Sequence, residues 1–238
     1  MRRAGKITAA ARALAGEMVK PGVTTQEINN EVERFIRKEG AIPSFLNYSG
    51  YPGSICISVN DEVIHGIPGK RVLQDGDIVS VDVGAFIGGF HGDCAATFAC
   101  GEISEEAKDL IRVTRESFFQ GIKFAKKGYR VSDISAAVQT YVESHGYSIV
   151  REYVGHGIGK NLHESPEVPN FGNPGRGARL LPGMTLAIEP MVNAGAAAIQ
   201  LLSDGWTVKT RDGKYAAHYE NTVLITDGEP EILTAPAI

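Results

Sequence analysis

The spacing of apolar side chains divides the chain into helical and strand-like segments. Apolar residues recur every three or four positions over 7–18 and again over 28–36, which predicts two amphipathic helices. Thr24 and Glu27 form a capping-box pattern that predicts the start of the second helix, and Gly40 predicts its end.

Near residue 54 the pattern changes to short runs rich in β-branched residues. These runs predict strands at 55–59, 77–83 and 95–99, with a hairpin turn at the glycine pair 88–89. A further helix is then expected to begin at Ser104 and to end near Lys127 and Gly128.

The helix-helix-strand order occurs twice along the chain. Residues 22–40 fall opposite 128–146, and residues 73–82 fall opposite 180–189, both at an offset of roughly 106 positions. The matched glycines and apolar positions predict two halves, roughly 1–101 and 102–238, related by an internal pseudo-twofold axis.

Five possible metal ligands lie within short apolar or glycine-rich runs: Asp82, Asp93, His156, Glu189 and Glu220. Carboxylates in strand-like sequence are costly to bury unless they are paired or bound to a metal ion. Four carboxylates and one imidazole form a hard, oxygen-rich ligand set that suits two divalent cations better than one. Each half contributes two of the carboxylates, so they are predicted to converge where the halves meet, with the histidine on a glycine-rich loop.

Composition narrows the functional classes. The 238 residues are 43% hydrophobic and 22% charged, which is typical of a globular chain with a real core. A net charge of −4 without a basic run provides no electrostatic footprint for nucleic acid or an anionic membrane. No apolar run reaches the roughly 20 residues of a membrane span, and none follows the N-terminal arginines as in a signal peptide. The three cysteines, an odd number without CxxC, favour a reducing compartment, so the expected location is the cytoplasm.

Several short motifs occur in an order and spacing that resemble one family. They are Asn47-Tyr-Ser-Gly-Tyr-Pro52, Ser58-Val-Asn-Asp-Glu-Val-Ile-His-Gly-Ile-Pro68, Gly92-Asp93, Gly155-His-Gly-Ile-Gly159 with His163-Glu164, Ala187-Ile-Glu-Pro190 and Ala217-His-Tyr-Glu-Asn221. The chain resembles the type I, bacterial-type methionine aminopeptidases of peptidase family M24 over nearly its whole length.

This resemblance implies a fold and an activity. The implied fold is the α+β pita-bread (creatinase/aminopeptidase) fold, a single catalytic domain over 1–238 in which the two halves form a curved antiparallel sheet with helices on its outer face. The implied activity is hydrolysis of the N-terminal (initiator) methionine from nascent proteins and peptides, preferably before a small, uncharged second residue. The implied protein is a monomer whose partners are peptide or nascent-protein N-termini, with transient ribosome association.

The resemblance also implies roles for the five ligands. Asp93 and Glu220 would bridge two ions, Asp82 would chelate one of them, and His156 and Glu189 would complete the other. The implied cofactors are two divalent ions per chain, and Fe²⁺, Mn²⁺, Co²⁺ and Zn²⁺ all suit this set. A hydroxide that bridges the ions would be the nucleophile, because the ions lower the pKa of water.

Further residues take catalytic and substrate-binding roles from the same resemblance. His163 would stabilise the tetrahedral intermediate, His65 would contact the substrate near its amine or leaving nitrogen, and Glu189 would also shuttle a proton. The methionine pocket would be lined by Tyr48, Tyr51, Cys56, His65 and Trp206. Phe45 and Leu162 stand where some members carry a cysteine and a phenylalanine, so the exact pocket shape is not carried over.

Two alternative functions share this ligand set. An Xaa-Pro-specific peptidase would usually carry a whole N-terminal domain, which is not expected here. A non-catalytic, peptide-binding member would be expected to have lost ligands, whereas all five are present. Type II methionine aminopeptidases insert a helical subdomain between the ligands that correspond to His156 and Glu189, and the roughly 33 residues between them leave no room for it.

The remaining histidines and the cysteine beside Asp93 have simpler interpretations. His91, His145 and His218 are expected at the surface or behind the ligands. Cys94 follows a ligand on a strand, so its side chain is predicted to point to the opposite face and into the core.

Overall fold

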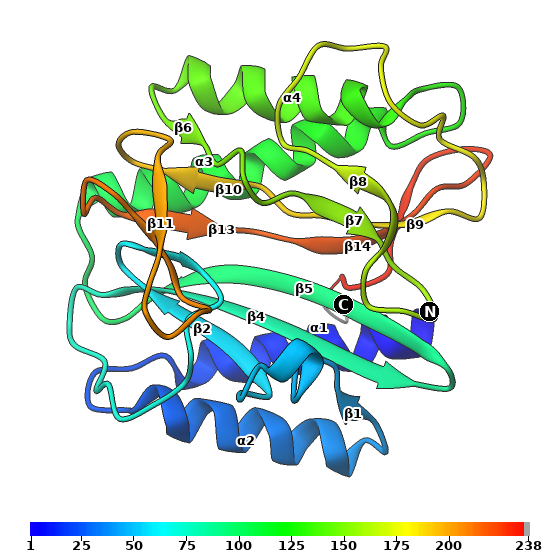
Figure 1. Ribbon diagram of the computed structural model, residues 1–238. Helices are drawn as coiled ribbons and strands as arrows, with labels where there is room; N and C mark the ends of the chain where they lie inside the picture. Colours follow the sequence, from blue (N-terminus) through cyan, green and yellow to red (C-terminus); the bar gives the residue numbers. More distant parts are fainter. Residues whose placement is uncertain (236–238) are drawn as a thin grey trace.

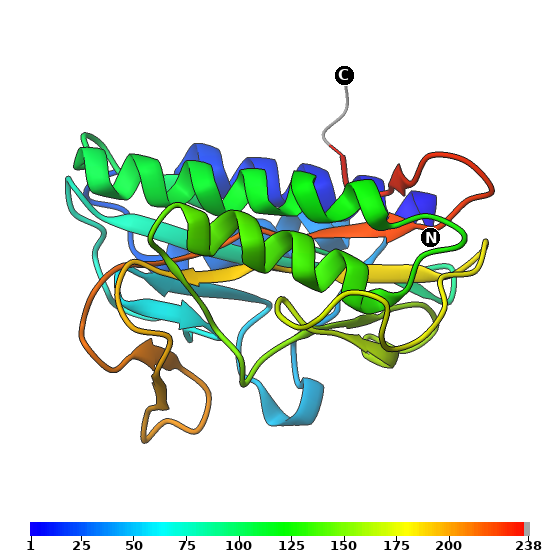
Figure 2. The same ribbon diagram turned by 90° about the horizontal axis from the view of Figure 1, so that it is seen from above.

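The computed structural model describes residues 1–235, in which two pairs of helices pack against antiparallel strands (Figure 1). Helices α1 (Arg2–Met18) and α2 (Thr25–Lys38) come from the first part of the chain. Helices α3 (Glu105–Gly121) and α4 (Val131–Ser144) come from the second part. Figure 2 shows α1 and α3 on the same side of the strands, while β11 (Ile199–Leu201) and the short turn η1 (Tyr48–Gly50) lie on the other side.

The strands of residues 1–235 form four small antiparallel sheets. In the first, the long strand β4 pairs with three others, and its members are β1 (Ile42–Pro43), β4 (Ile78–Ile87), β2 (Ile55–Val59) and β5 (Phe90–Ala99). The five-stranded sheet has the order β15 (Glu231–Ile232), β14 (Asn221–Leu224), β9 (Thr185–Ile188), β7 (Gly155–Gly157) and β8 (Glu164–Val168).

Two three-stranded sheets complete the layer. One has the order β13 (Ala216–His218), β10 (Met191–Asn193) and β6 (Ser148–Ile149). The other has the order β11, β12 (Val208–Thr210) and β3 (Glu62–Ile64). No helix among residues 1–235 is both long enough and apolar enough to cross a bilayer.

Local sequence explains where α2 and α3 begin. The Thr24 side chain accepts a hydrogen bond from the Glu27 amide, and the Glu27 carboxylate accepts one from the Thr24 amide at 2.7 Å, so the predicted capping box is confirmed. Ser104 caps α3 as predicted. The predicted end of that helix is wrong, because α3 ends at Gly121 and continues as the 3₁₀ turn η2 (Ile122–Phe124), a common tightening of a last turn.

Each pair of helices covers its own apolar core. Ile28, Val32 and Ile36 of α2 are fully buried in a cluster with strands β2 and β4. A second cluster buries the apolar faces of α3 and α4 against β9, β10 and β14. Burial of these faces is the main contribution to the stability of each helix pair. The order of two helices followed by strands occurs in both parts, and the pseudo-twofold relation between them stays a prediction.

A buried arginine joins the two parts of the chain. Arg12 of α1 is only 6% exposed, and its Nη1 donates hydrogen bonds to the carbonyl oxygens of Ala95 at 3.1 Å and Glu220 at 2.9 Å. Its Nη2 reaches the carbonyl oxygen of Thr234 at 3.3 Å. Beside it, Ala95 and Glu220 exchange two backbone hydrogen bonds of 3.3 and 3.0 Å. These contacts fix β5 against the segment between β13 (Ala216–His218) and β14, which carries Glu220.

Candidate metal centre

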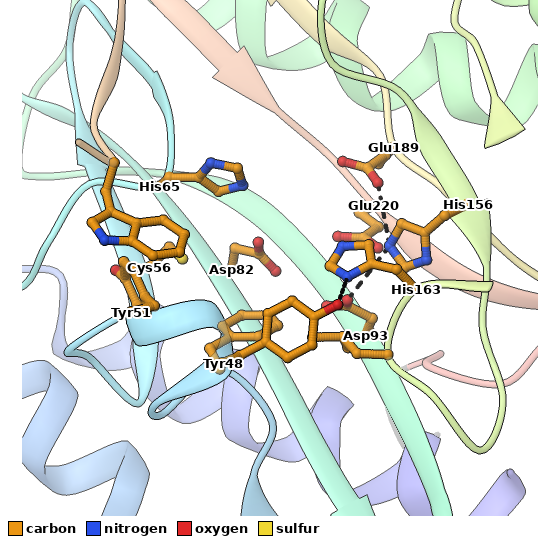
Figure 3. Close-up of a pocket in the computed structure, with 13 residues that line it drawn as sticks. Tyr48, Tyr51, Cys56, His65, Asp82, Asp93, His156, His163, Glu189 and Glu220 are labelled. Atoms are coloured by element: carbon orange, nitrogen blue, oxygen red, sulfur yellow. Dashed lines mark hydrogen bonds and ion pairs between the residues drawn. The ribbon is translucent and has the colours of Figure 1, made fainter. Parts of the chain in front are cut away.

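One cavity of about 120 Å³ brings together every residue that the sequence analysis assigned to the site (Figure 3). Its lining consists of Phe45, Tyr48, Tyr51, Cys56, His65, Asp82, Asp93, His156, Leu162, His163, Glu189, Trp206 and Glu220. Asp93, Glu189 and Glu220 gather with His156 and His163 at one end, where Tyr48 also lies, whereas Tyr51, Cys56 and His65 lie at the other end, with Asp82 between the two groups.

Two of the carboxylates come from the β4–β5 hairpin. Asp82 lies opposite Ala95, and Asp93 lies opposite Gly84, so the two aspartates sit on neighbouring strands two positions apart. Gly84, opposite Asp93, has no side chain and so leaves room for the Phe45 ring. A Cβ on Gly84 would lie 2.7 Å from that ring. Cys94 is fully buried outside the cavity lining, as its alternation on the strand predicted.

The other donors come from the five-stranded sheet and its border. Glu189 follows β9 directly, and Glu220 lies between β13 and β14. The predicted glycine-rich loop for His156 is wrong, because the histidine lies in strand β7 and pairs with Ala187. The glycines on either side permit this pairing. A Cβ at Gly155 would lie 2.3 Å from a backbone oxygen of β9, and a Cβ at Gly157 would lie 2.3 Å from a backbone oxygen of β8.

The orientation of His156 suits a metal ligand. Its Nδ1 lies 2.9 Å from the carbonyl oxygen of Gly157, which can only accept, so the proton is on Nδ1. The lone pair of Nε2 therefore faces the carboxylates, 3.6 Å from Glu189 Oε1 and 3.9 Å from Asp93 Oδ2. Asp93, His156 and Glu220 can each place one donor atom within 4.8 Å of the others.

Several buried oxygens at this end lack a hydrogen-bond partner among residues 1–235. They are Asp82 Oδ1, Asp93 Oδ1 and Glu220 Oε1. A buried carboxylate oxygen without a donor is costly, and a cation is the ligand that this donor chemistry fits. The residues present therefore fit divalent metal ions, which agrees with the predicted oxygen-rich set.

Burial controls the protonation of these groups. It raises the pKa of Asp82 to about 7 and that of Glu189 to about 8. Burial, and then repulsion by neighbouring carboxylates, raises the pKa of Asp93 and Glu220 well above the usual range. Burial also lowers the pKa of His156 to about 4, so this imidazole is neutral near pH 7. Without a cation the acidic cluster therefore retains protons, which a cation must displace.

Divalent-cation affinity is accordingly expected to rise as the pH increases from 6 to about 8. Asp82 and Glu189 hold protons below pH 7 and 8, and each proton competes with the ion. Titration calorimetry with Mn²⁺ in buffers of different ionisation enthalpy measures both the affinity and the protons released. An affinity that is flat over this range, without proton release, contradicts the assignment.

The same pKa shifts predict how the stability of the cation-free protein depends on pH. The carboxyl pKa values rise from 3.8 for Asp82 and 4.5 for Glu189 in the unfolded chain to about 7 and 8 in the folded chain. Their contribution to stability is therefore complete below pH 4 and is lost as the pH rises through 7 and 8. The increase in Tm caused by Mn²⁺ is expected to be larger at pH 8 than at pH 6, as differential scanning fluorimetry would measure.

Two further histidines face the cavity. His65 follows β3 in the left-handed region, with a φ of 59°, a strained conformation that is typical of functional positions. Burial lowers its pKa to about 4. The His163 ring lies 4.2 Å from the His156 ring, and its Nδ1 is 2.7 Å from the Tyr48 hydroxyl (Figure 3).

The other end of the cavity is apolar. Phe45, Tyr51, Cys56 and Leu162 are buried together there, with Trp206 packed against them. The Tyr51 hydroxyl donates to the carbonyl oxygens of Ile55 or Gly66, at 3.1 and 2.8 Å, which holds its ring edge-on to Trp206 at 5.1 Å. Such a wall suits an unbranched apolar side chain.

Sequence reasoning missed two contacts at the site. Tyr48 was predicted only as a pocket wall, and its hydrogen bond to His163 crosses 115 positions that no local pattern connects. His218 was expected at the surface or behind the ligands, and it lies behind them: it is 2% exposed, and its Nε2 is 3.6 Å from Glu189 Oε2, a contact that was not predicted. Its position two residues before Glu220 in extended sequence was the available signal.

Comparisons with known proteins agree with this geometry. Residues 1–227 match the model of metallopeptidase family M24. Over 98% of its length the chain is 59% identical to a methionine aminopeptidase of Clostridium acetobutylicum, covering 94% of that relative. It is 55% identical to methionine aminopeptidase 1 of Bacillus subtilis, with coverage of 98% and 94%.

A solved structure extends the comparison to the fold. The crystal structure of a methionine aminopeptidase from Thermotoga maritima superposes with a TM-score of 0.97 at 47% identity, covering 98% of this chain and 94% of that one. The predicted α+β pita-bread fold and the predicted family are thereby confirmed. From its sequence, its fold and its divalent-metal donor set, the chain belongs to metallopeptidase family M24.

Proposed function

We propose that this protein is a methionine aminopeptidase that hydrolyses the N-terminal methionine of peptides and proteins. One observation carries the proposal: a single cavity joins an oxygen-rich donor set to an apolar, aromatic wall. An aminopeptidase needs both, the first for the free amine and the scissile carbonyl and the second for the side chain. Relatives 55% and 59% identical to the chain bear that name.

The proposed centre holds two divalent ions, with Fe²⁺, Mn²⁺, Co²⁺ and Zn²⁺ as candidates. In this arrangement Asp93 and Glu220 would hold both ions, Asp82 would hold one of them, and His156 and Glu189 would hold the other. The contact of His156 Nε2 with Asp93 and Glu189 supports their grouping. When bound, such ions lower the pKa of water and polarise the carbonyl.

The surrounding side chains would orient the substrate and move its protons. Burial lowers the pKa of His163, so its imidazole is neutral. If the Tyr48 hydroxyl donates to Nδ1, then Nε2 carries the proton and can donate to the carbonyl oxygen as negative charge develops. His65 would contact the substrate amine or leaving nitrogen, and Glu189 would pass a proton through its carboxylate oxygens.

The cavity also limits the substrate. Its volume of about 120 Å³, which includes the donor end, is below the ~150 Å³ of an apolar cavity that binds one benzene, so it leaves room for no more than one substrate side chain. Tyr48, Tyr51, Cys56, His65 and Trp206 would line it. The preference for a small, uncharged second residue belongs to the same proposal. So do a single monomeric domain, a cytoplasmic location and transient ribosome association.

Replacing Tyr48 with phenylalanine is expected to lower kcat about 10-fold and to leave KM nearly unchanged. The phenylalanine ring would still line the cavity. Without the hydroxyl, however, nothing would hold the His163 proton on Nε2, and either ring nitrogen could carry it. Steady-state kinetics over pH 6–9 would measure this, with Tyr129→Phe at an exposed site as control. A change in KM alone would show that Tyr48 acts only as a wall.

Peptide hydrolysis tests the proposed function directly. Free amino acid is measured from Met-Ala-Ser and from Ala-Pro-Ala, with metal-free protein and after addition of Mn²⁺, Fe²⁺ or Co²⁺. Metal-dependent release of methionine from the first peptide alone is expected. Cleavage of the proline peptide alone would favour the Xaa-Pro peptidase, and no cleavage by folded protein would favour a non-catalytic peptide-binding member.

A further inference from the structure

Besides the five assigned metal ligands, the side chain of His218 also faces the acidic cluster. His218 ends strand β13, two residues before Glu220, and it is 2% exposed. Its Nε2 is buried and lacks a hydrogen-bond partner among residues 1–235. This nitrogen lies 3.6 Å from Glu189 Oε2 and 4.0 Å from Glu220 Oε2. A buried polar atom without a partner, aimed at two carboxylates, needs an explanation.

The distances match those of the histidine already assigned as a ligand. His156 Nε2 stands 3.6 Å from Glu189 Oε1 and 3.9 Å from Asp93 Oδ2. The two imidazoles thus approach different oxygens of the same Glu189 carboxylate. Donors about 2.0–2.2 Å from one ion are at most ~4.4 Å apart, so both sets of distances allow a shared ion. Glu189, His218 and Glu220 can also place their donor atoms within 4.8 Å of one another.

The backbone holds His218 in this orientation. The Thr97 hydroxyl of β5 accepts a hydrogen bond from the His218 amide at 2.9 Å and lies 2.9 Å from its carbonyl oxygen. The same hydroxyl is 2.8 Å from the Ser80 hydroxyl of β4. Three strands therefore fix the backbone from which the imidazole projects, as a preorganised ligand requires.

We propose that His218 is a sixth protein ligand of the metal centre, so that the centre contains two imidazole nitrogens instead of one. The inference rests on the proposed dinuclear centre and adds a donor to its five residues. A second imidazole makes the set softer and favours Fe²⁺, Co²⁺ or Zn²⁺ over Mn²⁺. The alternative, in which Nε2–H donates to the Glu189 carboxylate without touching an ion, is an outcome of the test.

X-ray absorption of the parent protein loaded with two equivalents of Co²⁺ counts the imidazoles per ion. The proposal predicts one imidazole per ion on average, whereas the five-ligand set predicts one half. This count needs no variant and no catalytic turnover. If the protein does not bind Co²⁺ at two sites, the proposed centre fails together with this inference. Two bound ions with half an imidazole each overturn only the role of His218.

The variant His218→Gln keeps a hydrogen-bonding amide but loses the imidazole nitrogen. It is expected to bind one of the two Co²⁺ ions at least ~10-fold more weakly by calorimetry, and to lower the imidazole count to that of the five-ligand set. His145→Gln, at an exposed position at the end of α4, is the matched control. Unchanged affinity and an unchanged visible Co²⁺ spectrum in a folded His218→Gln variant overturn the proposal. If that variant does not fold, the parent count decides.

Discussion

The variant Asp93→Asn is expected to lose at least one metal ion and to lower kcat/KM for methionyl peptides by ~10³-fold or more. Asp93 is 4% exposed, and its Oδ1 lacks a partner among residues 1–235. Asparagine keeps the shape but removes the negative charge and one donor oxygen from the proposed bridge. Loss of about 4 kcal/mol of transition-state stabilisation corresponds to this factor.

Metal analysis and steady-state kinetics on the same preparation measure this prediction. Asp227→Asn is the matched control, since Asp227 is exposed and pairs with Lys127 at the surface. In cation-free buffer at pH 8 the Asp93→Asn variant should be no less stable than the parent, because it removes a buried acid from a repulsive cluster. Intact metal binding together with intact hydrolysis would show that the bridging assignment is wrong.

The variant His163→Ala is expected to lower kcat by about 10²–10³-fold and to leave the metal content unchanged. The role proposed for His163 is donation to the carbonyl oxygen in the transition state, and removal of one such donor typically costs this factor. Its Nδ1 is engaged by Tyr48, so the effect depends on Nε2. KM should change much less, because the contact strengthens only as charge develops.

Kinetics with Met-Ala-Ser and metal analysis check this result, with His145→Ala at an exposed position as control. A His163→Gln variant, whose amide can still donate, should recover part of the lost kcat. If His163→Ala instead loses metal in proportion to activity, then His163 belongs to the ligand set or supports His156, whose ring lies 4.2 Å away. An unchanged kcat would remove His163 from the mechanism.

The helices were predictable because their determinants are local. The capping box at Thr24 and the buried face of Ile28, Val32 and Ile36 lie within a few turns of each other. The strand at His156 was not predictable from the sequence. The flanking glycines are required there because backbone oxygens of β9 and β8 lie so close that a Cβ at either glycine would be 2.3 Å from one of them. That approach is a property of the folded chain, and in the sequence alone the same glycines suggest a loop.

The candidate site was predictable to a similar degree. Acids in apolar runs without basic partners indicated a metal centre, because burial of unpaired carboxylates is so costly. The resemblance supplied the roles of His65 and His163 and the pocket wall, which spacing alone does not give. The Tyr48–His163 hydrogen bond and the inward orientation of His218 depend on tertiary register, so they required the structure.

The backbone pair between Ala95 and Glu220 has a consequence for protein engineering. A break at the exposed turn around Gly101 leaves Asp82 and Asp93 on one fragment and the remaining donors on the other. Neither fragment alone contains a complete ligand set, and in the intact protein Arg12 of the first fragment donates a hydrogen bond to the Glu220 carbonyl oxygen of the second. We therefore expect two such fragments to regain the complete donor set, and with it a metal-dependent signal, only when fused binding partners bring them together.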